Sequence, residues 1–393
     1  MKTTDPSGVA KSHVRANPQG GRQRLLAVQV LRAVGALLVA WVHAINAAED
    51  ALLGTPKQAH FFHWEDFGAS GLDIFFVISG FIVSLVAARA ASEDRELRGA
   101  NARQFLSRRI TRIFPLFWIL TALSFVRVLL AHPEHTTKIS WLPTLLLFPS
   151  ISYPPGIPLL YLGWSLVFEM YFYFALAAFL YLTPRSVIRN TVLLLSGMVA
   201  LGLAIDIRRP LLIFWMNPMV LEFVLGCVIG LLFARVSKSE GSFSKLGIVL
   251  AWVGALSLAA TVFTGYGMAS EARSIVAGED CWLRVGVWGV PSALLVGGVI
   301  FWGPAMRSLP ARIMVFLGDA SYSIYLCTIP TLGAIKSVWH HFGNPGPDVG
   351  VFMGILGCAG TGVTCYLLLE RPLMRFFHNW YKPIPFQGIA GKS

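Results

Sequence analysis

The chain has 393 residues, of which 55% are hydrophobic and only 13% are charged, and its mean hydropathy is +0.64. This composition excludes an ordinary water-soluble domain, in which roughly 25% of residues are charged. The net charge of +12 raises the question of a nucleic-acid partner, which the distribution of the basic residues answers.

Apolar segments long enough to cross a bilayer, about 18 to 25 residues each, recur along most of the chain. We predict an all-α, polytopic bundle of ten transmembrane helices. This membrane-embedded domain covers residues 26–376, between an N-terminal tail (1–25) and a C-terminal tail (377–393). The ten predicted spans are 26–48, 70–88, 113–131, 159–182, 188–205, 211–234, 246–264, 285–302, 313–336 and 348–369.

The basic residues are distributed unevenly between the two sides of the predicted bundle. With the N-terminus placed in the cytoplasm, 23 of the 32 Lys and Arg residues fall in inner segments, 6 in outer segments and 3 within spans. This is the positive-inside pattern for an even number of spans, so both termini are predicted to be cytoplasmic. The basic charge therefore reports membrane topology, and nucleic acid is not an expected partner.

The first predicted span carries an ionisable residue near each end. Arg32 and His43 are eleven positions apart, which at about 100° per residue places them on one helix face, about 16 Å apart along the axis. Ionisable groups at this depth are costly and usually functional, so we expect a polar track, with Arg32 towards the inside and His43 towards the outside. The alternative is that both side chains only reach for lipid headgroups.

Carboxylates occur in three other spans. Asp73 opens the second span near the depth of His43, where it could orient the imidazole or increase its basicity. Glu169 and Glu222 each lie about ten residues into their spans, near the midplane. For these two, direct chemistry and structural ion pairing are alternatives. The cations within the spans are Arg32, Arg127 and Lys336.

The predicted inner loop 89–112 is rich in arginine and ends directly before the third span. Arg109 and Arg112 are three residues apart and share one helical face, and arginine suits bidentate phosphate binding. A phosphorylated carrier on the cytoplasmic side could dock there. The alternative is a topology anchor that contacts lipid headgroups.

Four stretches resemble a known family: VQVLRAVGALLVAWVHA, GASGLDIFFVISGFIVS, FLSRRITRIFPLFW and GWSLVFEMYFYF. They match the acyltransferase family 3 of integral membrane O-acyltransferases, and they are most similar to bacterial members that O-acetylate exopolysaccharides such as succinoglycan. The matching positions are Arg32, His43, Asp73, Phe76, Ser79, Gly80, Arg109, Arg112, Trp164, Ser165 and Glu169.

The resemblance implies an acyl donor, usually acetyl-CoA, that is reached from the cytoplasm. Arg32, Arg109 and Arg112 would bind this donor. It also implies a multi-pass protein of the bacterial inner membrane, with no tightly bound cofactor and no metal. The five cysteines form no spaced set, which likewise indicates neither a zinc site nor a disulfide framework.

The acceptor implied by the resemblance is a hydroxyl of a glycan or a lipid-linked oligosaccharide outside the membrane or in its outer leaflet. His43 would act as a general base on that hydroxyl, or as a transient acyl carrier, and Asp73 and Glu169 would assist it. The lipid bilayer and, as further partners, polysaccharide-assembly proteins complete the expected interactions.

A proton-coupled transporter is the alternative from another class of protein. Membrane-embedded His, Glu, Asp and Arg side chains are also the components of a proton relay. The sequence shows no paired broken helices and no inverted repeat, and the arginine-rich inner loop fits a phosphorylated donor better, so we favour the acyltransferase.

Overall fold

The computed structural model describes residues 18–51, 67–152, 154–205, 209–236, 243–264, 271–342 and 347–380. These residues form helices joined by short turns, and none of them lies in a strand. Most of each predicted tail, residues 1–17 and 381–393, lies outside the described ranges.

The prediction of an all-α bundle with about ten spans is confirmed. Among the described residues, nine helices are long and apolar enough to cross a membrane, and the number is ten if two further helices, which meet at a bend of 71°, together form one span. The long helices are α1 (Pro18–Ala51), α3 (Ser70–Ala90), α4 (Arg95–Ala131), α6 (Gly163–Leu182), α7 (Val187–Ala204), α9 (Val220–Val236), α10 (Ser244–Thr264), α13 (Val290–Trp302), α14 (Leu309–Asp319), α15 (Ser321–Phe342) and α16 (Pro347–Cys365). The shorter ones are α5 (Trp141–Leu146), α8 (Pro210–Trp215), α11 (Ala272–Val276), α12 (Cys281–Arg284) and α17 (Arg371–Trp380).

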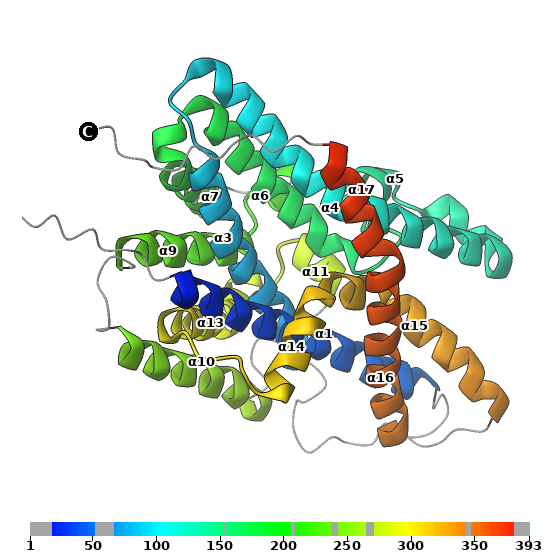
Figure 1. Cartoon of the computed structure of the whole chain (residues 1–393). Helices are drawn as coiled ribbons and strands as arrows, with labels where there is room; N and C mark the ends of the chain where they lie inside the picture. Colours follow the sequence, from blue (N-terminus) through cyan, green and yellow to red (C-terminus); the bar gives the residue numbers. More distant parts are fainter. Residues whose placement is uncertain are drawn as a thin grey trace, which may run out of the picture.

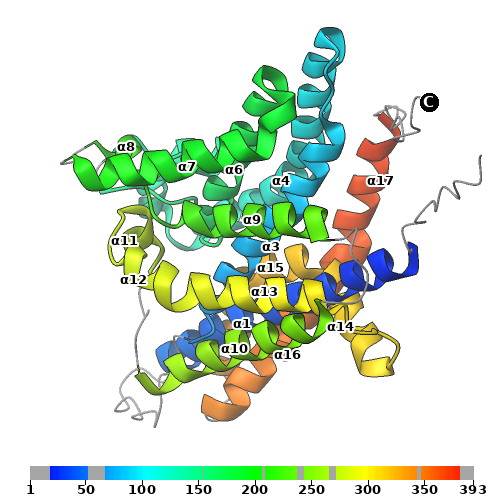
Figure 2. The same cartoon turned by 90° about the vertical axis from the view of Figure 1, so that its left-hand side faces the viewer.

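The first span lies in the middle of the bundle. Helix α1 contacts α3, α13, α14, α15 and α16, which surround it in Figure 1. A second group, α9, α13 and α10, stacks in that order in Figure 2, and the neighbouring helices of this stack are in contact. The helix that carries Arg32 and His43 is therefore enclosed by protein along much of its length.

The arginine-rich inner segment is helical and continuous with the third span. Helix α4 begins at Arg95, after Asp94, whose side chain accepts a hydrogen bond from the backbone N–H of Glu96. It runs without interruption to Ala131, through Pro115. Because the helix does not break between loop and span, Arg109 and Arg112 project from a rigid element at the end of the bundle that is predicted to face the cytoplasm.

Glycines allow helices α3 and α9 to pack with their backbones in contact. A Cβ atom built at Gly80 would lie 2.2 Å from the carbonyl oxygen of Phe223, and one at Gly226 would lie 2.2 Å from that of Val77. Atoms cannot approach so closely, so any side chain would force the helices apart. Small residues at helix contacts are typical of membrane bundles.

Replacing Gly226 with alanine is expected to destabilise the protein by about 1–3 kcal/mol, because the added methyl group overpacks this contact. The measurement is thermal unfolding of the purified protein in detergent. Gly197→Ala is the matched control, because a Cβ there meets no atom within 4 Å, and it should leave the unfolding temperature unchanged or slightly higher. Equal melting temperatures for the wild type and Gly226→Ala would contradict the observed contact.

Candidate active site

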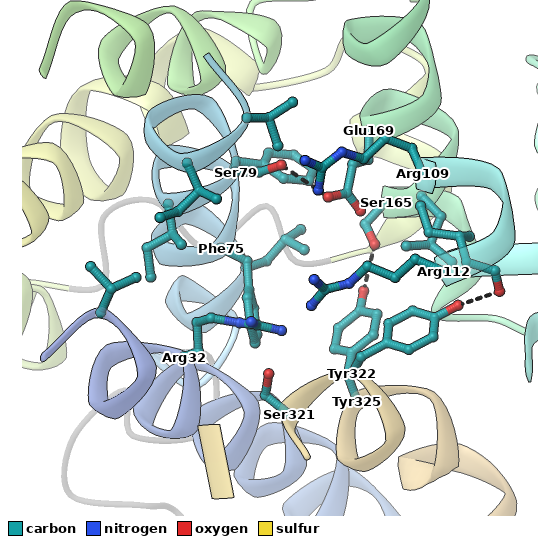
Figure 3. A pocket seen from close by; sticks show the side chains of 18 of the residues that line it. Arg32, Phe75, Ser79, Arg109, Arg112, Ser165, Glu169, Ser321, Tyr322 and Tyr325 are labelled. Carbon is teal, nitrogen blue, oxygen red and sulfur yellow. Dashed lines mark hydrogen bonds between the residues drawn. The ribbon is translucent and has the colours of Figure 1, made fainter. Parts of the chain in front are cut away.

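The three arginines predicted to bind the donor line one cavity. This inner cavity has a volume of about 330 Å³ and lies between α1, α3, α4, α6 and α15. Arg32 comes from α1 and Arg109 and Arg112 from α4. Figure 3 shows the guanidinium groups of Arg32 and Arg112 directed into the same space. Segments about 80 residues apart in the sequence thus combine to make a cationic pocket, which is called inner after its predicted side of the membrane.

Two of these arginines, Arg32 and Arg109, are held in different ways. Arg32 donates a hydrogen bond to the side-chain oxygen of Gln29, one turn earlier on α1, at 3.1 Å. The guanidinium of Arg109 lies over the rings of Phe105 and Tyr173, with centroid distances of 5.6 and 5.7 Å. Such cation–π contacts orient a guanidinium without using its N–H donors. Donor capacity is therefore kept for an anion that enters the cavity.

Glu169 lies in the same cavity as the arginines. Its carboxylate accepts hydrogen bonds from the hydroxyl of Ser79, at 2.9 Å, and from the hydroxyl of Tyr173. The sequence leaves ion pairing and direct chemistry open for Glu169, and the hydrogen bonds that the structure shows come from neutral hydroxyl groups. Tyr173 also faces Arg109, so Glu169 helps to fix the wall against which that arginine rests.

His43 lies in a second cavity, with a volume of about 200 Å³. Its ring meets the ring of Tyr161 edge-on, with centroids 5.9 Å apart. The other polar side chains around this outer cavity include Asn46, Glu271 and Arg284. Burial raises the pKa of the Tyr161 phenol, which precedes α6, and its neutral hydroxyl accepts a hydrogen bond from the backbone N–H of Ala272 at 3.2 Å. An imidazole, a phenol and a carboxylate around one small cavity suit the binding of a hydroxyl compound.

The two cavities lie end to end along the helices. On α1, residues 25–32 line the inner cavity and residues 39–46 the outer one. At the start of α3, residues 69 and 72 line the outer cavity, and residues 72–83 further along line the inner one. At the start of α6, residues 161–164 line the outer cavity, and residues 165–173 line the inner one. Leu72 and Tyr325 belong to the walls of both cavities. The polar track predicted from the spacing of Arg32 and His43 is thus a pair of cavities that share one partition.

Asp73 does not make the contact that we expected with His43. Both of its carboxylate oxygens accept hydrogen bonds from Arg284, Oδ1 from Nε at 3.1 Å and Oδ2 from Nη2 at 2.8 Å, and both side chains are fully buried. Arg284 also donates to the carbonyl oxygen of Ala69 and lies over the ring of Trp288. The carboxylate therefore holds an arginine that lines the outer cavity beside His43.

Sequence reasoning missed Arg284 because it stands at the last position before the predicted eighth span. The positive-inside pattern assigns it to an outer segment. In the structure it ends the short helix α12, and a π-helical turn (Val285–Gly289) connects it to α13. The sequence did contain a signal for this ion pair. It is a basic residue directly at a span boundary, with an acidic residue at the same depth in another span that lacks an assigned partner.

Glu222 is buried outside the two cavities. It lies on α9 beside the Asp73–Arg284 pair, and its carboxylate packs against Gly289. It therefore contributes to the packing of α9 against the turn that precedes α13, and we assign it no part in the chemistry.

The possible metal ligands that lie together among the described residues are remote from both cavities. The described residues contain one group of side chains close enough together to share an ion, His132, Glu134 and His135. All three are exposed, His132 directly before the turn Pro133–Lys138 and the other two within it, and none lines either cavity. The candidate site consists of arginines, hydroxyl groups, carboxylates and one histidine.

Comparison with known proteins assigns the chain to a family. Residues 25–370 match the acyltransferase domain of the Acyl_transf_3 family, and the protein belongs to this family. The resemblance found in the four sequence stretches is thereby confirmed. With its many apolar helices, the chain is a multi-pass membrane protein of the acyltransferase class.

Individual relatives agree with this class. The chain is 28% identical over 334 residues to the exopolysaccharide production protein ExoZ of Rhizobium meliloti (strain 1021), which covers 81% of this chain and 92% of that protein. It is 26% identical to the putative peptidoglycan O-acetyltransferase YrhL of Bacillus subtilis (strain 168), over 84% of this chain. It is 24% identical to the O-acetyltransferase OatA of Staphylococcus aureus (strain NCTC 8325), over 79% of this chain.

The chain covers most of the first relative but only 53% of the length of each of the other two. No solved structure matches the chain.

Proposed function

We propose that the protein transfers an acyl group, expected to be acetyl, from acyl-CoA on the cytoplasmic side to a hydroxyl of an extracytoplasmic or lipid-linked glycan. The observation that carries this proposal is the pair of cavities placed end to end, with arginines in one and His43 in the other. Family membership and relatives named as O-acetyltransferases support the reaction class.

The inner cavity would receive the donor. Arg32, Arg109 and Arg112 bring three positive charges, against the single carboxylate of Glu169 in the same walls. Guanidinium groups bind phosphate oxygens in pairs, so they suit the phosphates of CoA. The remaining walls are mostly apolar and aromatic, which suits the uncharged pantetheine arm. The thioester would then reach towards the shared partition.

The outer cavity would receive the acceptor. His43, as a neutral imidazole, would accept the proton of the sugar hydroxyl while the hydroxyl oxygen attacks the thioester carbonyl. The bond between the carbonyl carbon and sulfur breaks, and the proton passes to the CoA thiolate, so that the products are an O-acyl ester and free CoA. The arginine and the histidine of the first span thus serve opposite ends of one reaction path.

The decisive experiment measures transfer of radiolabel from acetyl-CoA into the glycan fraction of membranes that contain the protein. We expect label in glycan and release of one CoA per acetyl group. Membranes with equal amounts of the Arg32→Gln, Arg112→Gln double variant serve as the control and should incorporate little label. Proton-coupled solute uptake without acetyl-CoA consumption would contradict the proposal and favour a transporter.

Removing a phosphate-binding arginine is expected to weaken donor binding selectively. For Arg112→Gln we expect the KM for acetyl-CoA to rise by about 10- to 100-fold with little change in kcat, because a charged hydrogen bond contributes about 1.5–3 kcal/mol. The KM for acetyl-pantetheine, which has no phosphate, should stay the same. Arg108→Gln is the matched control on the same helix, because Arg108 lines neither cavity. An equal rise in KM for both donors would contradict the phosphate contact.

A further inference from the structure

The partition between the two cavities consists of side chains that the reaction must bring close to the acyl group. Leu72 on α3 and Tyr325 on α15 line both cavities, and they are only 5% and 6% exposed. If the donor enters from the arginine-lined cavity, the acyl group is the leading end of the molecule. It therefore meets Leu72 and Tyr325 before it can reach a hydroxyl held near His43. This step rests on the proposed function.

Hydrogen bonds fix the position of the Tyr325 ring. Its hydroxyl donates to the carbonyl oxygen of Leu162 at 3.0 Å and lies 2.7 Å from Oγ of Ser165 (Figure 3). Oγ of Ser165 is also within hydrogen-bonding distance of the same carbonyl, at 3.1 Å. On the other side, the Tyr325 ring meets the Phe75 ring edge-on, with centroids 6.0 Å apart. A ring anchored at its hydroxyl and packed along its side cannot swing away without breaking these contacts.

The hydrogen bonds of the Tyr325 hydroxyl are made at the start of α6, where neighbouring residues line different cavities. Leu162 and Trp164 line the outer cavity, whereas Ser165 and Leu166 line the inner one. The hydroxyl of Tyr325 is bound to this junction, so its ring spans from α15 to the start of α6. Leu72 supplies apolar bulk from α3. Residues of α3, α6 and α15 together therefore form the partition between the two cavities.

We propose that Tyr325, with Leu72, determines which acyl groups the enzyme transfers by limiting the length of the chain beyond the thioester carbonyl. An acetyl group carries only one methyl group beyond its carbonyl carbon, so it needs little space past the partition. Each further methylene must either displace the ring of Tyr325 or enter the small outer cavity, where the acceptor binds. Tyr325 is thus a specificity-determining residue that selects acetyl over longer acyl groups.

The test compares acetyl-, butyryl- and hexanoyl-CoA as donors for the wild type, Tyr325→Ala and Leu72→Ala. We expect the ratio of kcat/KM for butyryl-CoA to that for acetyl-CoA to rise about 15-fold in Tyr325→Ala, since each accommodated methylene is worth about a fourfold change. Leu72→Ala should shift the same ratio in the same direction, by less. Tyr171→Ala is the matched control, because Tyr171 is a partly buried tyrosine of the same bundle that lines neither cavity. It should leave the ratio unchanged.

A binding measurement covers the case in which a variant folds but loses turnover. The dissociation constants of ethyl-CoA and hexyl-CoA thioethers, which cannot react, should shift in favour of hexyl-CoA in Tyr325→Ala. A wild type that transfers acetyl, combined with unchanged chain-length ratios in both Tyr325→Ala and Leu72→Ala, would overturn this inference and leave the proposed function standing. A folded wild type that transfers none of the three acyl groups would overturn both.

Discussion

Replacement of His43 with alanine is expected to lower acetyl transfer by about 10²- to 10⁴-fold, the contribution typical of a general base. The reason is that His43 supplies the imidazole of the outer cavity, and histidine is the side chain that most often transfers the proton of a reacting group. The measurement is the initial rate of label transfer from acetyl-CoA to glycan at saturating donor. The KM for acetyl-CoA should change little, because the donor is bound by arginines in the other cavity.

The control for this substitution is His132→Ala. His132 is exposed on the outer turn and lines neither cavity, so its loss should leave the rate unchanged. The two variants should also melt at similar temperatures, which separates a chemical effect from unfolding. A stable His43→Ala protein with a normal rate would exclude His43 as the base and would remove the central residue of the proposed mechanism.

Removal of Arg284 is expected to destabilise the protein by about 3–5 kcal/mol, because it leaves the carboxylate of Asp73 buried without its partner. Arg284→Met keeps much of the side-chain volume while removing the charge and the donors. The measurement is thermal unfolding in detergent, with retention of the folded state checked by gel filtration. We expect the double variant Asp73→Asn, Arg284→Met to recover part of this loss, because no unpaired charge remains.

The exposed ion pair between Glu93 and Arg185 is the control for the buried one. Its side chains are 63% and 77% exposed, so solvent and salt screen the interaction. Arg185→Met should therefore leave the unfolding temperature unchanged. Additive effects of Asp73→Asn and Arg284→Met would show that the two buried residues do not stabilise each other. If Asp73→Asn lowered kcat without lowering stability, the earlier hypothesis that Asp73 orients His43 would regain support.

Local sequence patterns were sufficient to predict the helices and part of the candidate site. Long apolar segments have few alternatives in a bilayer, because every backbone polar group must be paired within a helix there, so the ten spans follow from hydropathy. The relation between Arg32 and His43 depends only on helix periodicity over eleven positions. The pairing of Arg109 with Arg112 depends on a single helical turn, which is why sequence alone placed each pair on one face.

The bend in the ninth predicted span illustrates a limit of hydropathy. The segment 313–336 reads as one apolar span, yet α14 and α15 meet near Ala320 at 71°. This angle follows from packing, because α14 lies against α1 and a Cβ at Gly318 would collide with the backbone at Gln29. Hydropathy measures transfer into the bilayer and carries no information on such contacts.

The class of protein, its helices and the residues that share a face of one helix follow from the amino-acid sequence, because these features depend on neighbours within a few turns. The packing of the helices brings Arg284 to Asp73, places Glu169 with the arginines, and positions Leu72 and Tyr325 between the two cavities. Asp73 and Arg284 are 211 positions apart, and Ser165 and Tyr325 are 160 apart. Contacts at that separation depend on how helices pack against one another, and helix periodicity places no constraint on which distant side chains meet.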